Sequence, residues 1–423
     1  MSESVNLEPT LPALRAEVLE AMDAVAAAPQ VKVALEKIEA DLETTLADQI
    51  ELTEIPSPPF AEEQRARAFE AKLCALGFEE VSRDGIGNVI GLRRGTGTGP
   101  AVVIAAHLDT VFAAGTDVTV KREGNVCRAP GISDDARGLA VLLEVLRVMQ
   151  SAGISTERDV YFVGTIGEEG NGDLRGAKHF VANPPQQIGA FISVDGANVH
   201  RVLKGSTGSR RIRAVFEGPG GHSWNAFGRA SANHALGRAV ARIADMQVPD
   251  EPRTSFTVGL LSGGTSVNAI SGSAQTEIDM RSVDPKSLDV LYEKVCAIVR
   301  DAADEENRRW NAPEGMRITV KIENIGFRPA GVCPPESAVL QCARAALKTL
   351  GLALEKYSFA STDQNAALAA GIPATTLGGG GSEGFNHNIN EWYDATNSYQ
   401  GPQAALLTIV ALAGLSGVSV PLV

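Results

Sequence analysis

Short runs of apolar residues recur along the first half of the chain, and each run ends at a polar tip. Residues 101–104 lead into His107, residues 160–163 lead into a Gly-Glu-Glu-Gly turn, and residues 191–194 lead into Asp195. Continuous apolar runs of this length are typical of strands that are buried on both faces. Helical periodicity lies between them, most clearly after residue 138. This alternation predicts an α/β domain with a mostly parallel sheet.

The N-terminal region has a helical pattern. Residues 1 to about 50 carry one apolar stripe at spacings of three and four, formed by Leu35, Ile38, Leu42, Leu46 and Ile50. The proline-rich segment 56–59 ends this helix, and a second helix is predicted over 62–76. We treat residues 1–45 as a helical extension of the α/β domain.

The pattern changes after about residue 204. Residues 210–217 alternate between polar and apolar side chains, which predicts a half-exposed antiparallel strand. The segments that follow predict the order β-α-β-β-α-β, which is the ferredoxin-like arrangement. We therefore expect an inserted α+β domain at 204–325. The α/β domain would then comprise 1–203 and 326–423.

Composition and charge exclude several classes of function. The net charge of −13 argues against a nucleic-acid-binding surface. The five cysteines are scattered and odd in number, which indicates reduced thiols and a cytoplasmic setting. The N-terminus lacks the pattern of a signal peptide. The apolar segment 404–423 is interrupted by Gly414, Gly417 and Pro421, so a core helix with a tail is expected rather than a membrane span.

Metal-ligating side chains gather at the predicted strand ends. Two histidines and three carboxylates follow or adjoin these ends: His107, Asp134, Glu169, Asp195 and His387. Imidazole and carboxylate are ligands for Zn²⁺, Mn²⁺ or Co²⁺, and five of them suffice for two ions that share one carboxylate. A metal pair lowers the pKa of a water held between the ions. Ligands bind at the carboxyl ends of the strands in such sheets.

Two further acids accompany this set. Glu168 is not needed as a ligand, and a carboxylate beside the metals is what a general base requires. Asp109 follows His107 by two residues, so continued strand geometry would place both side chains on one face, where Asp109 accepts the second imidazole N–H. Taken singly, these acids and histidines have ordinary explanations as surface pairs or helix caps, as for Asp134 and Asp135 before a helix. Their joint order at strand ends favours a metal site.

The chain resembles the M20 family of metallopeptidases, which are dizinc amidohydrolases, over residues 45 to 415. The motifs that carry the resemblance are A-A-H-L-D-T-V, G-I-S-D-D-A-R-G, G-E-E-G, S-V-D-G, G-G-H-S and N-H-N-I-N-E-W. It implies that His107 and Asp195 bind one metal, that Glu169 and His387 bind the other, and that Asp134 bridges them. Glu168 would be the general base and acid, with Asp109 supporting His107.

The resemblance extends to the inserted domain, which in the family serves as a lid and dimerisation domain. His222 matches the histidine that stabilises the oxyanion, often from the partner subunit. Asn268 and Arg281 match positions that bind the carboxylate or carbonyl of the substrate, and Arg281 suits a bidentate carboxylate contact. The sequence departs from the common family pattern at Asp134–Gly138 and at Asn388–Asn390, which bears on the substrate.

The expected function is therefore metal-dependent hydrolysis of small peptides by a cytoplasmic di- or tripeptide exopeptidase. We expect two divalent ions, zinc before manganese or cobalt, and a homodimer with no nucleic-acid or membrane partner. An N-acyl amino acid amidohydrolase or carboxypeptidase is the alternative within the same chemistry, and a non-catalytic metal-binding homodimer is the alternative outside it. The run Gly378–Gly381 lacks the Lys-Ser/Thr of a phosphate loop, and a close approach to substrate is the favoured interpretation.

Overall fold

The computed structural model describes residues 11–78, 80–354 and 356–423, and these divide into two compact units. Unit 1 contains the described residues up to Ser206 together with Val332–Val423, and unit 2 is Thr207–Gly331. From the sequence, the second junction was expected after residue 325. That position falls inside β14 (Thr319–Arg328), which pairs with β9 (Gly208–Glu217) along its length and so belongs wholly to unit 2.

Unit 1 is built on a sheet of six strands in the order β1-β2-β6-β3-β7-β17. The four strands β6, β3, β7 and β17 run parallel to one another. The strands β2 and β1 extend the sheet at one edge with antiparallel pairing. The mostly parallel sheet predicted from the sequence is confirmed. The strands are β1 (Glu80–Arg83), β2 (Val89–Arg93), β3 (Ala101–His107), β6 (Val160–Thr165), β7 (Ile188–Val194) and β17 (Ala374–Leu377).

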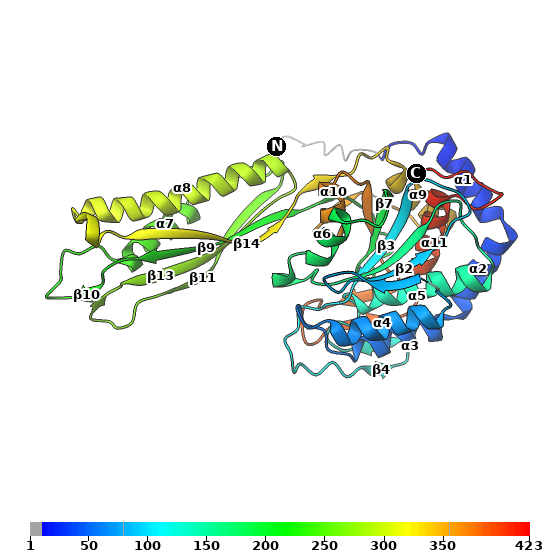
Figure 1. Ribbon diagram of the computed structural model, residues 1–423, viewed down its shortest axis with the longest axis horizontal. Helices are drawn as coiled ribbons and strands as arrows, with labels where there is room; N and C mark the ends of the chain where they lie inside the picture. Colours follow the sequence, from blue (N-terminus) through cyan, green and yellow to red (C-terminus); the bar gives the residue numbers. More distant parts are fainter. Residues whose placement is uncertain (1–10, 79, 355) are drawn as a thin grey trace, which may run out of the picture. The chain divides into compact units, whose positions relative to one another are not determined.

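Helices cover both faces of this sheet (Figure 1). Every residue of β3 is buried, and its side chains alternate between two cores. Val102, Ile104 and Ala106 join the larger core. Val103 and its odd-numbered neighbours join the smaller core on the opposite face. The larger core is covered by α5 (Ala136–Ser151), α9 (Ala338–Thr349) and α11 (Gln400–Ala413), and the smaller by α6 (Arg175–Ala182) and α10 (Gln364–Ala369).

The N-terminal extension forms three helices rather than one: α1 (Ala16–Ala27), α2 (Pro29–Ala40) and α3 (Leu42–Thr53). Breaks at Ala28–Pro29 and at Asp41 separate them, and the apolar stripe continues from α2 into α3. The first ten residues of the predicted helical region lie outside the described residues. The extension joins the larger core, and Gln49 of α3 donates a hydrogen bond of 2.7 Å to the carbonyl of Ile132. The next helix, α4 (Glu63–Ala75), ends close to its predicted end.

Two small sheets were not predicted. One has the order β18-β19-β5-β4, from β4 (Lys121–Glu123), β5 (Val126–Arg128), β18 (Ser382–Gly384) and β19 (Trp392–Asp394). The other has the order β15-β8-β16, from β8 (Leu203–Ser206), β15 (Gly331–Val332) and β16 (Ser358–Ala360). Strands of two to four residues are too short to produce a readable period-2 pattern.

Unit 2 has the predicted ferredoxin-like order. Its four-stranded sheet runs β11-β13-β9-β14 with all neighbours antiparallel. The strands β11 (Thr254–Gly263) and β13 (Ser273–Ser282) complete the sheet, and α7 (Ala232–Ala244) and α8 (Pro285–Arg309) supply the helices. Buried side chains from both helices and the sheet form one separate core. A two-stranded ribbon joins β10 (Gly221–His222) to β12 (Ala269–Ile270).

No helix among the described residues is long and apolar enough to cross a membrane. The apolar C-terminal segment begins within α11, which is buried from Gly401 to Ala413 and ends before Gly414. This agrees with the core helix that the interrupting glycines and proline predict.

Candidate metal centre

The carboxyl edge of the parallel sheet collects the predicted metal ligands. His107 is the last residue of β3, and the turn with Glu168 and Glu169 follows β6. Asp195 follows β7 directly. Because these three strands are parallel neighbours, their carboxyl ends meet at one edge. Two loops add Asp134, just before α5, and His387, between β18 and β19.

The predicted ligands form two groups that share Asp134. His107, Asp134 and Asp195 offer one ligand atom each within 4.8 Å of one another, and so do Asp134, Glu169 and His387. Oδ1 of Asp134 lies 3.0 Å from Nε2 of His107, and Oδ2 lies 3.0 Å from Nε2 of His387. Nε2 of His387 is also 2.8 Å from Oε1 of Glu169. One carboxylate therefore faces both halves of the cluster, as a bridging ligand must.

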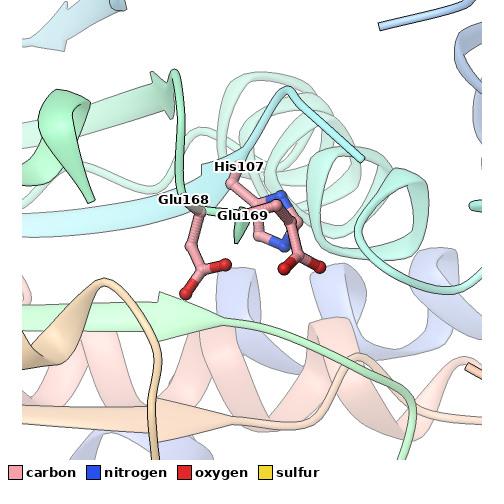
Figure 2. Close-up of side chains that lie close together, drawn as sticks. All are labelled: His107, Glu168 and Glu169. Carbon is pink, nitrogen blue, oxygen red and sulfur yellow. The ribbon is translucent and has the colours of Figure 1, made fainter. Parts of the chain in front are cut away.

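Glu168 lies at the same place. His107, Glu168 and Glu169 also bring ligand atoms within 4.8 Å of one another, and all three are buried. Figure 2 shows both carboxylates pointing to the side on which the His107 ring lies. The carboxylate of Glu168 therefore lies beside the two groups of ligands, in addition to the five predicted ligands.

Burial and charge act against each other in this cluster. Burial disfavours ionisation of Asp134, but the hydrogen bonds to His107 and His387 outweigh it and hold its pKa well below the usual range. Hydrogen bonds to Asp134 and Glu169 raise the pKa of His387 to about 11. Burial raises the pKa of Asp195 to about 7, and the charge of Asp134 adds to this effect. The cluster holds more carboxylates than imidazoles, so it favours cations.

Asp109 contacts the cluster differently from the expectation. Strand geometry ends at His107, and Nδ1 of His107 lies 3.0 Å from the backbone carbonyl of Asp109 but 3.7 Å from its carboxylate. The carboxylate instead accepts hydrogen bonds of 2.8 Å from the backbone N–H groups of Glu168 and Glu169. Burial raises the pKa of Asp109 to about 6. Asp109 therefore fixes both the imidazole and the turn that carries the two glutamates.

Two buried carboxylates contact the cluster in ways that were not predicted, although Asp135 was considered as a helix cap. Asp135 caps α5 by accepting from Gly138 N at 3.0 Å, and it accepts from His107 N at the same distance. Glu391 accepts hydrogen bonds from the backbone N–H groups of Gly131, Ser133 and Asp134 at 3.0, 2.9 and 3.2 Å. Burial raises the pKa of Glu391 to about 7. Glu391 lies in the motif N-H-N-I-N-E-W, four residues after His387, but no role was assigned to it from the sequence.

The glycine run Gly378–Gly381 packs against neighbouring backbone inside unit 1, and its expected approach to substrate stays a prediction. Gly379 N and Gly380 N donate to the carbonyls of Gly196 and Ala197 at 2.7 and 2.8 Å. A Cβ on Gly378 would lie 2.0 Å from the carbonyl oxygen of Asn198. The run therefore lacks side chains because it abuts the loop that follows Asp195.

The three remaining predicted site residues lie in unit 2. His222 is exposed on β10 and pairs with Ala269 of β12. Asn268 precedes Ala269, and its backbone carbonyl accepts a hydrogen bond of 2.9 Å from Ser223 N. Nδ1 of His222 lies 3.2 Å from Trp224 N and 3.4 Å from Asn225 N. These contacts make Nδ1 an acceptor in the neutral ring and leave the proton on Nε2.

Arg281 is not brought to His222 and Asn268 within unit 2. It lies near the far end of β13, where its Nε donates to Asp279 Oδ2 at 2.7 Å. Eight residues separate it from Ser273, which corresponds to roughly 27 Å of strand. The ribbon that carries His222 lies beyond the Ser273 end (Figure 1).

The sheet, the insertion and the shared-carboxylate cluster define the fold and site of a metallohydrolase. The model of the Peptidase family M20/M25/M40 matches residues 103–410. The chain therefore belongs to this family, and the resemblance inferred from the motifs is confirmed.

Individual relatives are distant but cover most of the chain. The uncharacterized protein YqjE of Bacillus subtilis is 24% identical over 348 residues, which are 78% of this chain and 89% of the relative. A succinyl-diaminopimelate desuccinylase of Corynebacterium glutamicum is 23% identical over 82% of this chain and 92% of its own. The structure of a tripeptidase from Staphylococcus aureus matches with a TM-score of 0.72 at 23% identity, covering 87% and 97% of the two chains.

Proposed function

We propose that this protein is an exopeptidase that hydrolyses di- or tripeptides with two divalent metal ions, of which zinc suits the ligand set best. The observation that carries the proposal is the shared carboxylate of Asp134, whose two oxygens face His107 and His387. Two groups of three ligands with one member in common fit a pair of ions. When bound, such a pair supplies Lewis acidity and lowers the pKa of a coordinated water.

The protein side chains would supply the proton transfers. Glu168 would take a proton from the attacking water and deliver it to the leaving amine, as general base and then general acid. Its buried backbone is held by Asp109, which also holds Glu169. The two glutamates are thus fixed by one carboxylate, and the base keeps its position relative to a ligand.

His222 would stabilise the oxyanion. Because Nδ1 accepts from the backbone, the Nε2–H group is available as a donor. Asn268, which lies beside His222, would bind a substrate carbonyl or carboxylate. Arg281 would bind a substrate carboxylate, for which it must exchange its present partner Asp279.

A homodimer accounts for these positions. His222 and Arg281 lie at opposite ends of unit 2, so one substrate that contacts both requires them to come from different copies. The edge strand β11 and the turn after it expose Leu260, Leu261 and Val267, and apolar side chains of this kind favour pairing with another chain. A cytoplasmic setting is supported by five cysteines without disulfide partners.

An N-acyl amino acid amidohydrolase is the second candidate, because the desuccinylase of Corynebacterium glutamicum matches 82% of the chain at 23% identity, the same identity as that of the tripeptidase structure. Both reactions cleave an amide bond and need the same metals and base. They differ in whether the substrate has a free or an acylated amino group.

A substrate panel separates the two candidates. Protein stripped with a chelator and supplied with Zn²⁺, Mn²⁺ or Co²⁺ is assayed on Ala-Ala, Gly-Gly-Gly, N-acetyl and N-succinyl amino acids. Metal-restored cleavage of the free peptides alone supports the exopeptidase. Cleavage of only the N-acyl compounds assigns the amidohydrolase, and no metal-restored turnover on any substrate contradicts both.

A further inference from the structure

A pocket with a volume of about 420 Å³ lies in unit 1 beside two loops of the metal cluster. Its lining includes Pro130, Ile389 and Asn390 from these loops, together with the charged residues Asp117, Lys121 and Arg128. The volume is in the range of small-molecule sites. The pocket was not predicted from the sequence, because Lys121 and Arg128 belong to the short hairpin of β4 and β5.

The chain connectivity keeps the pocket close to the cluster. Ile389 follows His387 by two residues, so their Cα atoms are at most about 7 Å apart, and Pro130 precedes Asp134 by four residues, at most about 14 Å. Glu391 joins the two loops, since its carboxylate binds the 131–134 turn and its carbonyl accepts from Ala129 N at 3.2 Å. A di- or tripeptide is long enough to span this separation.

Two positively charged side chains lie next to each other in the lining of the pocket. Lys121 and Arg128 are direct cross-strand partners in the β4–β5 ladder, and both are exposed. Among the described residues neither forms an ion pair. Asp117, the acid of the pocket, has its Oδ1 engaged by Thr119 N at 3.0 Å. The pocket lining therefore has a net positive charge in a chain whose net charge is −13.

On the opposite face of the same hairpin, a third cation forms an ion pair with a carboxylate. Arg122 points away from Lys121 and donates two hydrogen bonds of 2.8 Å to Glu43 of α3. Like charges directly opposite each other on neighbouring strands destabilise a sheet. Lys121 and Arg128 keep this unfavourable pairing with Asp117 as the one acidic residue of the pocket lining, and an incoming carboxylate would relieve it.

We propose that this pocket binds a carboxylate of the substrate, so that the enzyme prefers small peptides or acyl amino acids with an acidic group remote from the scissile amide. Lys121 and Arg128 bind the carboxylate, and Ile389 and Pro130 contact the methylene groups that lead to it. This inference rests on the proposed hydrolase function and adds a selectivity to it.

The kinetic test compares substrates that differ by one charge. Matched pairs are N-succinyl-alanine with its terminal carboxamide analogue, and Ala-Ala-Glu with Ala-Ala-Gln. The double variant Lys121→Gln/Arg128→Gln should lower the carboxylate-to-carboxamide ratio of kcat/KM about tenfold, through KM. Arg122→Gln is the matched control and should leave the ratio unchanged. An unchanged ratio in the double variant overturns the proposal.

A binding measurement separates this proposal from the hydrolase itself. Isothermal titration of the metal-loaded protein with glutarate should give binding that weakens about tenfold in the double variant and not in Arg122→Gln. If no substrate is hydrolysed but this difference is present, the pocket assignment holds and the proposed function fails. If substrates are hydrolysed while glutarate binds wild type and double variant equally, or does not bind, the pocket assignment fails alone.

Discussion

Asp134 and His387 are separated by 253 positions in the sequence, yet Oδ2 of Asp134 lies 3.0 Å from Nε2 of His387. The other oxygen of the same carboxylate lies equally close to His107. This one side chain joins a ligand from the central strand to a ligand from a late loop. Asp134 is therefore the one ligand that the two groups have in common.

Replacing Asp134 should affect both metal ions. We expect Asp134→Ala to bind metal at least about 100-fold more weakly than wild type, because each group of ligands loses its shared member. Metal content after dialysis, measured by mass spectrometry of the metals, tests this. The exposed Asp23→Asn variant of α1 is the control and should keep full metal content. Retention of both ions by Asp134→Ala would exclude the bridging role.

Replacing Glu168 should abolish most of the catalysis without affecting the binding of the metal ions. The five predicted ligands remain in Glu168→Ala, so metal content should stay at the wild-type level. The loss of a general base should lower kcat by roughly 10²–10⁴-fold. Steady-state kinetics and metal content are measured on the same sample. A near-normal kcat, or a loss of metal that matches the loss of activity, is incompatible with the role assigned to Glu168.

The elements that could be predicted from the sequence are those whose apolar and polar residues recur with a clear strand or helix period. The apolar run that forms β3 and the helix pattern of α5 follow from side-chain periodicity, and His107 and Asp134 could be placed at their ends because ligands gather at that edge of a parallel sheet. Periodicity also predicted the order of elements in unit 2. Long regular segments carry enough repeats to be recognised.

The parts that were missed depend on loops. Glu391 binds three backbone N–H groups, but a loop carboxylate has no period that reveals its partners. Asp109 was expected to act on His107 through its carboxylate, and the chain leaves strand geometry before that residue, so the carboxylate turns to Glu168 and Glu169 instead. Such contacts follow from tertiary packing rather than from local sequence.

Glu391 should act as a positioning residue for the Asp134 turn. In Glu391→Ala, three backbone N–H groups, two of them buried, lose their acceptor, so we expect metal affinity to fall by roughly 10–100-fold while the ligands stay unchanged. Competition with a chelator measures the affinity. Because excess metal should restore much of the activity, activity at saturating metal distinguishes this role from direct catalysis. Wild-type metal affinity in the variant would contradict it.

The cysteines should differ in reactivity. Cys74 is exposed, whereas the other four are buried, and burial raises the pKa of Cys342 to about 12. A raised pKa means less thiolate at any pH below it, so Cys342 should stay unreactive up to pH 9 in the folded protein. Titration with a disulfide reagent at pH 8 should modify one thiol quickly, and all five after denaturation. Fast modification of more than one thiol would contradict the buried positions.

Mixing two inactive variants should reveal where His222 acts. If a second copy supplies His222, a dimer of Glu168→Ala with His222→Ala contains one complete site, formed by the intact cluster of one copy and the intact histidine of the other. Random reassociation in equal amounts makes half of the dimers mixed, so activity should recover to about one quarter of wild type. Each variant incubated alone is the control. If His222 acts within its own copy, every site in the mixture lacks one of the two residues and no activity returns. Recovery therefore assigns the histidine to the partner, and its absence, in a mixture that chromatography shows to contain mixed dimers, assigns it to the same chain.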